Sequence, residues 1–528
     1  MNKCYNQNLS NYYFAKQLIK DDMREEIKVV FVVEEYSDWD KSLPVYEEFL
    51  TRKNVKTFIV LLPTYSTPDY LAKRPYGRYD RKIWEFFHKK YEDVYDITNI
   101  GNLKKLKPDY VFMQSPYEHL RPILGSNEVM KYAKVCYVPY GATGAERFLR
   151  MHCENICFFS NVSMGFLSSE DVKKEMDTAW NVSVSKGYQS FFNVGYPSLD
   201  IDFPLKEKND QKCKKVLWTP RWTYDESIGG SHFFEYKDGY LNFARNHKND
   251  SFGIRPHPLM FETFINEGRI TREEVDKYKE DLHKADVIID DDNRFITDTL
   301  SETDILVTDF SSIMATYFVS GRPMIYCTSQ HKLIGDFKKF MKGTYIAENW
   351  EDVERHLDNL LRGIDPLQAI REQVSREFKN FHTGAAKRIV NTIVQNYRER
   401  SFNEKEGMKN FVQEEDNILQ QKVAVANQIL KLESVQNITA CNWYSYYLEL
   451  IEIKMTDKRL MEMENNCYRQ IVDIYTKQEN NEKKYLAEIA MLLFVEPERM
   501  EVPIEICKWN SELKSDLACK LEYQGLGI

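Results

Sequence analysis

Three short segments place hydroxyl, imidazole and guanidinium side chains directly after apolar runs. They are residues 218–222 (WTPRW), 254–258 (IRPHP) and 308–312 (TDFSS). Arg supplies a permanent forked cation, and a His between two prolines has a restricted backbone. Serines at the start of a helix can cap that helix or donate hydroxyls to an anion bound there. These residue types suit a diphosphate whose leaving group gains negative charge.

Each segment alone also has an ordinary structural explanation: a structural Trp pair, a rigid turn with a surface Arg, and a helix cap without a ligand. Their coincidence favours a site, because strand ends on one edge of a parallel sheet converge on a single crevice. We therefore predict an anion pocket that binds a donor. Its residues would be Thr219, Arg221, Arg255, His257, Thr308, Asp309, Ser311 and Ser312.

The apolar runs predict two open α/β units, because strand-like and helix-like stretches alternate along the chain. The first unit has predicted strands at 27–33, 56–62, 110–113 and 135–138. The second has predicted strands at 216–219, 251–255, 287–290, 305–308 and 324–326. Two Rossmann-like halves facing a cleft form the GT-B arrangement. We predict the α/β class, GT-B, with an α-helical C-terminal extension.

The predicted domains are an acceptor domain at 1–205, a nucleotide-donor domain at 212–400 and the extension at 401–528. A lysine-rich stretch at 206–215 separates the first two, since a dense run of charges is solvated. Within the extension, 413–432 and 446–462 carry apolar residues at helical spacing, so each should bury one face. The tail is not strongly basic. We therefore favour a partner protein or homo-oligomer over lipid contact as its role.

Composition and charge exclude some classes of protein. The 528 residues carry a formal net charge of −9, so no basic field favours nucleic acid. The first residues contain no signal-peptide core, and no apolar run reaches the ~20 residues of a spanning helix. We predict a cytoplasmic protein, peripheral at the inner face of the plasma membrane.

The same segments, in this order, resemble motifs of the CDP-glycerol glycerophosphotransferase family, which builds teichoic acids and related capsule polymers. The third segment is followed by an apolar helix and by 321–326 (GRPMIY). Residues 195–200 (GYPSLD) resemble the family's G-x-P-R-x-D element, and 382–388 (HTGAAKR) resemble its D-G-x-A-x-x-R element. Order and spacing agree over about residues 190–395.

The resemblance implies a metal-independent GT-B enzyme without a cofactor. In the family, the His and the Ser pair contact the donor's phosphates, which places His257, Ser311 and Ser312 in that role. The expected reaction moves glycerol phosphate or ribitol phosphate from a CDP-linked donor to a glycan or lipid-linked acceptor. Two alternatives remain: a glycosyltransferase with a nucleotide-sugar donor, and a non-catalytic subunit that binds partners through its helical tail.

Two departures from the family concern the acceptor base and donor recognition. Tyr140 stands where members often have a proposed basic His, and Thr316 stands where they often have Asp. A phenol with a pKa of about 10 is a poor base. Glu34 and Glu35, which follow the first predicted strand, are alternative bases, although they could equally be polar loop residues.

Three consecutive carboxylates at 290–292 invite a metal interpretation. Neighbouring side chains at a strand end point in alternate directions, so an exposed acidic turn is the favoured interpretation, and no metal site is predicted.

We expect turnover to survive EDTA, because Arg and His side chains would stabilise the leaving group in place of a divalent ion. CMP release with and without chelator checks this. Loss of turnover that Mg²⁺ or Mn²⁺ restores would contradict it.

Overall fold

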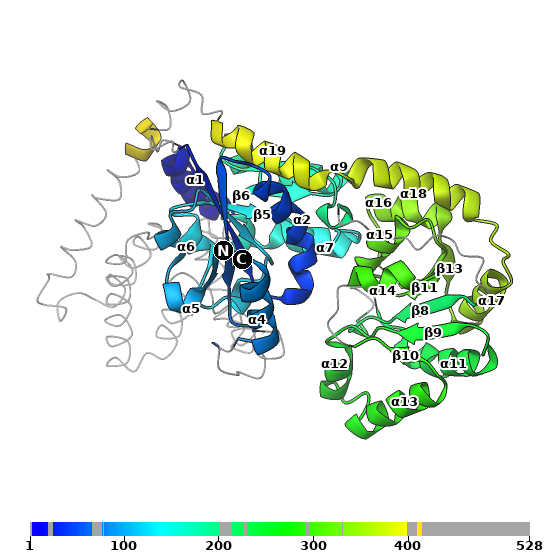
Figure 1. The fold of residues 1–528 in the computed structure, drawn as a ribbon. Helices are drawn as coiled ribbons and strands as arrows, with labels where there is room; N and C mark the ends of the chain where they lie inside the picture. Colours follow the sequence, from blue (N-terminus) through cyan, green and yellow to red (C-terminus); the bar gives the residue numbers. More distant parts are fainter. Residues whose placement is uncertain are drawn as a thin grey trace, which may run out of the picture.

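The computed structural model describes residues 3–18, 25–65, 77, 79–200, 213–225, 230–291, 296–329, 331–398 and 409–413. Two parallel β-sheets organise these residues, each flanked by helices on both faces (Figure 1). Most of the predicted extension at 401–528, and residues 206–212 of the linker predicted at 206–215, lie outside the described residues. The short helical piece at 409–413 contacts the first domain, where Phe411 stacks on Tyr188 at 6.2 Å.

The first sheet has seven strands in the order β3-β2-β1-β4-β5-β6-β7, all paired in parallel. Its strands are β1 (Ile27–Val33), β2 (Val55–Leu61), β3 (Val94–Asp96), β4 (Tyr110–Met113), β5 (Lys134–Tyr137), β6 (Val162–Leu167) and β7 (Ser190–Asn193). β1 buries both faces: Val30 and Val32 enter one core, and Val29 and Phe31 enter the other. Burial on both faces explains its apolar sequence, which Lys28 alone interrupts.

Helices cover both faces of this sheet. They are α1 (Lys3–Leu18), α2 (Trp39–Leu50), α4 (Arg81–Lys90), α5 (Ile97–Ile100), α6 (Ser126–Val129), α7 (Glu146–Glu154), α8 (Ile156–Phe159), α9 (Glu170–Ala179) and α10 (Asn181–Val184). Single 3-10 turns complete the domain: η1 (Tyr36–Asp38), η2 (Leu103–Leu106), η3 (Glu118–Leu120) and η4 (Pro197–Leu199).

The second sheet has the order β10-β9-β8-β11-β12-β13, again all parallel. Its strands are β8 (Lys215–Thr219), β9 (Ser251–Ile254), β10 (Ile288–Ile289), β11 (Ile305–Thr308), β12 (Met324–Cys327) and β13 (Tyr345–Ala347). This is the Rossmann order, with the direction of progression reversing between β8 and β11. Ligands of such sheets bind outside the carboxyl ends of the strands at that reversal.

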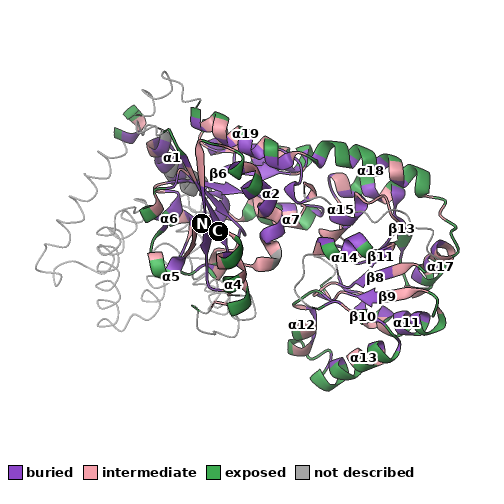
Figure 2. Cartoon of the chain, in the orientation of Figure 1, coloured by how far each residue is buried: buried purple, intermediate pink, exposed green. Residues whose placement is uncertain are grey.

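Nine helices and one turn belong to the described part of the chain beyond β8. They are α11 (Phe233–Asn246), α12 (Met260–Asn266), α13 (Arg272–Lys284), α14 (Ile296–Glu302), α15 (Ile313–Phe318), α16 (Asp336–Phe340), η6 (Met341–Gly343), α17 (Trp350–Leu361), α18 (Gln368–His382) and α19 (Ala385–Arg398). Figure 2 shows buried strands and exposed outer faces on α13 and α18. The predicted α/β class with two Rossmann-like domains is confirmed.

The last helix, α19, returns to the first domain. Ile389, Val390 and Ile393 are fully buried in the same apolar cluster as Val29 and Phe31 of β1. Figure 1 shows α19 running across the N-terminal domain after α18. Residues 385–398, predicted with the second domain, therefore pack against the first, because the apolar stripe of α19 matches an uncovered face of that sheet.

A clasp of hydrogen bonds joins the two segments that connect the domains. Asp200 accepts hydrogen bonds from the backbone of Gly384 and, at 2.7 Å, of Ala386, at the start of α19. Arg388 donates to the carbonyl of Val194 at 2.8 Å. Gly195 has φ +89, and a Cβ there would lie 3.0 Å from the Cα of His382. These contacts give a structural reason for the residues found at 195–200 and 382–388, the two segments that resemble family motifs.

The Asp200→Ala variant should lower the free energy of unfolding by about 1.5–3 kcal/mol, because it leaves two amides at the start of a helix without their anionic acceptor. Urea denaturation of the full chain measures the change. Asp238→Ala is the control, since the Asp238 side chain is 74% exposed. Equal stability of the two variants would contradict the role of the clasp.

Candidate functional site

Two threonine hydroxyls are hydrogen-bonded to each other at the ends of β8 and β11, where the strand order of the second sheet reverses. Thr219 ends β8 and donates to Thr308 at the end of β11, with 2.7 Å between the two Oγ1 atoms. Thr308 donates in turn to the carbonyl of Asp309 at 2.7 Å. Both Thr side chains are buried. Their hydroxyls therefore hold the strand ends together, and contact of Thr219 and Thr308 with the donor stays a prediction.

Asp309 is also buried and organises the loop after β8. Its Oδ2 accepts from the backbone N–H of Arg221 at 2.8 Å, and its Oδ1 lies 2.7 Å from Nδ1 of His232. Burial disfavours the charged imidazole, but the hydrogen bond and negative charge of Asp309 outweigh it, so the pKa of His232 is raised. His232 could not be singled out from the sequence, because its partner lies 77 positions away.

Arg221 carries the positive charge of this pocket. Its guanidinium lies 5.6 Å from the ring centres of both Phe310 and Phe148, and Nη1 donates to the Phe310 carbonyl at 2.5 Å. Phe148 belongs to α7 of the first domain. Burial lowers the pKa of Arg221, yet a guanidinium stays charged at neutral pH. Among the described residues, its buried Nε has no hydrogen-bond acceptor.

Ser311 and Ser312 precede the short helix α15. Ser312 occupies the N-cap position without a side-chain cap bond, so the capping alternative is not observed. The buried Oγ of Ser311 has no partner among the described residues. Gly141 of the first domain lies against Ser312: a Cβ at Gly141 would be 3.5 Å from its Oγ. The serines therefore sit where the two domains meet.

His257 lies beyond the end of β9 as a neutral hydrogen-bond donor. Its Nδ1 accepts the backbone N–H of Leu259 at 3.2 Å, which leaves the imidazole proton on Nε2. The residue is exposed at the protein surface, although neighbouring protein atoms partly desolvate its imidazole. That desolvation, together with the charge of Arg221, lowers its pKa to about 4. The Nε2–H can therefore donate to an anion at neutral pH.

Arg255 is committed to an ion pair. Its Nη1 lies 2.8 Å from Oδ2 of Asp290 and 3.3 Å from Oγ1 of Thr299. The predicted exposed acidic turn is therefore wrong for Asp290, which is 5% exposed because Arg255 neutralises it. Asp291 is exposed and pairs with Lys279 at 3.1 Å, and residue 292 lies outside the described chain. Arg255 braces β9 and β10 through this pair.

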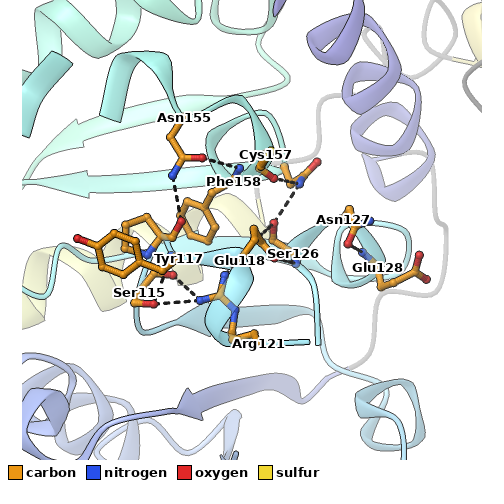
Figure 3. Close-up of polar contacts among 12 residues, drawn as sticks. Ser115, Tyr117, Glu118, Arg121, Ser126, Asn127, Glu128, Asn155, Cys157 and Phe158 are labelled. Atoms are coloured by element: carbon orange, nitrogen blue, oxygen red, sulfur yellow. Dashed lines mark hydrogen bonds and ion pairs between the residues drawn. The ribbon is translucent and has the colours of Figure 1, made fainter. Parts of the chain in front are cut away.

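Glu34, one of the predicted bases, follows β1 and belongs to a buried network of charged side chains with Arg121 and Glu118. Its Oε1 accepts from Arg121 at 2.9 Å, and its Oε2 accepts from Ser115 Oγ at 2.8 Å. Figure 3 shows the guanidinium of Arg121 among Ser115 and Glu118. Burial raises the pKa of Glu34, while Arg121 and Ser115 oppose this by stabilising the carboxylate.

Glu35, the second predicted base, has its backbone clamped by one side chain. Gln114 accepts from the Glu35 N–H at 2.8 Å and donates to its carbonyl at 2.8 Å. Gln114 also accepts from the N–H of Glu34 at 2.6 Å. Gln114 follows β4, and the two glutamates follow the neighbouring strand β1. The side-chain amide of Gln114 therefore fixes the backbone of the turn that carries Glu34 and Glu35.

Tyr140 is a hydrogen-bonded phenol in a desolvated place. Its hydroxyl lies 2.7 Å from that of Tyr117. Burial and the nearby Tyr117 raise the pKa of Tyr140 well above its ordinary value. A phenolate is thus disfavoured, so the environment suits a hydrogen-bond donor better than a base.

Asp38, between η1 and α2, is a titratable residue that the sequence reasoning did not single out. It is half-buried at the end of η1, and burial raises its pKa to about 7, with Asp40 and Glu34 adding to the rise and Lys41 opposing it. In the sequence, Asp38 is one of several acidic residues after the first strand. Its raised pKa distinguishes it from them only in the folded chain.

Metal and membrane signals are absent from the part of the chain that the structure describes. It contains no group of three or more His, Cys, Asp or Glu side chains placed to hold a metal ion. None of the described helices is both long and apolar enough to span a bilayer. Whether turnover needs a metal is left to the chelator experiment.

The two Rossmann-like domains place a cation, an imidazole donor and hydroxyls beside the reversal point of the second sheet. Residues 171–395 match the family described as CDP-glycerol:poly(glycerophosphate) glycerophosphotransferase. The match confirms the resemblance carried by the strand-end segments. No curated protein matches the chain.

Solved structures with similar overall architecture include two epimerases and a polymerase. UDP-GlcNAc 2-epimerase from Neisseria meningitidis is 15% identical over 70% of this chain and 100% of that chain, with a TM-score of 0.44. A UDP-N-acetylglucosamine 2-epimerase from Listeria monocytogenes is 11% identical over 71% and 97%, at 0.46. The wall teichoic acid polymerase TagF is 13% identical over 75% and 94%, at 0.41.

His257→Ala and Ser311→Ala should each weaken CDP binding by roughly tenfold to a hundredfold, because each removes a donor to a charged group worth about 1.5–3 kcal/mol. Isothermal titration of CDP into the full chain measures this. His283→Ala, an exposed site on α13, is the matched control. Wild-type affinity in both folded variants would overturn the donor-site assignment.

Proposed function

We propose that the chain transfers glycerol phosphate or ribitol phosphate from a CDP-linked donor to a glycan or lipid-linked acceptor in cell-surface polymer synthesis. One observation carries the proposal: Arg221, His257 and Ser311 follow the carboxyl ends of β8, β9 and β11, next to the reversal point of the second sheet. The family match over the same residues supports the class of donor.

Arg221, His257 and Ser311 would each make a different kind of contact with the diphosphate of the donor. Arg221 supplies a fixed positive charge, held by the Phe310 carbonyl and two aromatic rings. The Nε2–H of His257 and the hydroxyl of Ser311 supply directed neutral donors, and neither needs to change protonation state at neutral pH. Donors that are fixed in place stabilise charge that develops in the transition state.

In the proposed reaction, an acceptor hydroxyl attacks the phosphorus that carries the polyol. The bond from the acceptor oxygen to that phosphorus forms, and the bond from the same phosphorus to the bridging oxygen breaks. CMP leaves with the electron pair, and the hydroxyl proton passes to a base and then to water. Charge grows on the bridging oxygen, where the side chains of the donor pocket stabilise it.

The first domain supplies the acceptor side. Gly141 lies against Ser312, which brings the Tyr117–Tyr140 hydroxyl pair to the edge of the donor pocket. The electrostatic influence of Arg221 on Tyr117 supports this placement. We place the reaction at the cytoplasmic face of the plasma membrane, on the strength of the family resemblance. Association through 401–528 is part of the same proposal.

A second candidate is a non-catalytic subunit that keeps the fold. Tyr140 favours it, because the family's proposed basic His is replaced by a phenol whose pKa is raised well above its ordinary value. Binding of CDP without turnover would be its signature. A nucleotide-sugar transferase is the third candidate, distinguished by its donor.

Purified full chain should release CMP from CDP-glycerol or CDP-ribitol when octyl N-acetylglucosaminide or octyl glycerol phosphate is the acceptor. Mass spectrometry of the product separates an added polyol phosphate from an added sugar. UDP-GlcNAc is the control donor and should give no product. Turnover of UDP-GlcNAc alone would favour the sugar transferase, and CDP binding with no turnover of either CDP donor would favour the subunit.

A further inference from the structure

A short β-bridge joins the backbones of the two domains at the start of α7. Residues 144–146, between β5 and α7, pair in the antiparallel sense with residues 332–334, which follow β12. Two backbone hydrogen bonds of 2.9 Å hold the bridge, from Glu146 to Lys332 and from Ile334 to Gly144. The bridge therefore fixes the start of α7 against the second domain. Figure 1 shows α7 on the side of the first domain that faces α14 and α15.

The approach of the domains at this bridge is close, and it is apolar. A Cβ at Gly144 would lie 2.5 Å from ring atoms of Phe337 in α16, which is itself buried. Ala145 is fully buried in a cluster whose other buried members, among them Phe310, all belong to the second domain. Phe148 of α7 packs against the same cluster. The two domains thus share one apolar core beside the donor site.

The bridge brings the ring of Phe148 to the cation of the donor site. Phe148 stacks on Phe310 with 6.0 Å between the ring centres and 17° between the ring planes. The guanidinium carbon of Arg221 lies 5.6 Å from each of these two ring centres. A cation within about 6 Å of an aromatic ring centre is attracted by the negative face of the ring, and more strongly where water is excluded. One of the two rings that hold Arg221 therefore comes from the other domain.

An aromatic ring holds a guanidinium without using its N–H groups. Arg221 donates from Nη1 to the carbonyl of Phe310 at 2.5 Å, and its buried Nε has no acceptor among the described residues. A buried donor without a partner is rare in folded proteins, so an acceptor from outside the protein chain is expected. A phosphate oxygen of the donor is such an acceptor. The ring contacts thus leave Arg221 positioned and still able to bind an anion.

We propose that Phe148 is a positioning residue for Arg221, so that the first domain completes the nucleotide-donor site of the second. This inference rests on the proposed function. The ring of Phe148 orients the guanidinium and does not itself touch the donor. When the bridge is open, Phe310 alone holds the guanidinium, and CDP binds more weakly. Donor binding and contact between the domains are therefore coupled through this one ring.

The test compares Phe148→Leu and Phe148→Tyr with wild type in the full chain, with Tm as the check on folding. Leu keeps an apolar side chain without an aromatic face, whereas Tyr keeps the face. Phe148→Leu should weaken CDP binding in isothermal titration by about 2–30-fold, the range expected for loss of a cation–π contact. Phe148→Tyr should bind CDP as wild type does. In an Arg221→Ala background, Phe148→Leu should cause no further loss, because the cation is absent.

A matched control separates the ring contact from general packing. Phe86 of α4 is also half-buried and has a cation, Lys90 Nζ, 5.2 Å from its ring centre, so Phe86→Leu should bind CDP as wild type. A folded Phe148→Leu variant with wild-type CDP affinity, or an equal loss with and without Arg221, overturns the positioning role while the transferase stands. Wild type that does not bind CDP overturns the proposed function and this inference with it.

Discussion

Asp309 accepts hydrogen bonds from the backbone of Arg221 and from both the backbone and the ring of His232, with no exposed surface of its own. The loop after β8 has no regular structure at Arg221, so this carboxylate is what fixes the cation's position. A buried carboxylate without such partners would be costly, which ties the loop and the strand end together. The position of Arg221 in the predicted donor site therefore depends on the hydrogen bonds that Asp309 accepts.

The first domain repeats the same arrangement with different residues. Arg121, fully buried, binds Glu34 at 2.9 Å and Glu118 at 3.0 Å, and it donates to the Ser115 carbonyl at 2.7 Å. This network fixes the loop after β4 that carries Tyr117. In both domains, buried ion pairs fix the loops that follow the strands. The partly exposed side chains of these loops remain available to contact substrates. Arg255 with Asp290 follows the same division.

Much of the fold could be predicted because β1, β4 and β11 are mainly apolar runs, and the structure has them at 27–33, 110–113 and 305–308. The strands β3, β6, β7 and β13 were missed, since β6 includes Ser and Gly and β3 has three residues. Segments rich in Arg, His and Ser marked the donor side. Thr219 and Arg255 bond to Thr308 and Asp290, which are distant from them in the sequence. Such structural partners could not be predicted from the segments themselves. Asp38 was missed for the same reason.

The return of α19 to the first domain has a consequence for protein synthesis. Ile389, Ile393 and Tyr397 complete a core whose strands begin at Ile27, so this core stays open until the second domain has been translated. At about 5–20 residues per second, the delay after Asp200 is roughly 10–40 s. During that interval an apolar sheet face is uncovered on the ribosome. Chaperone demand should therefore be greatest for chains stalled between the two segments of the clasp.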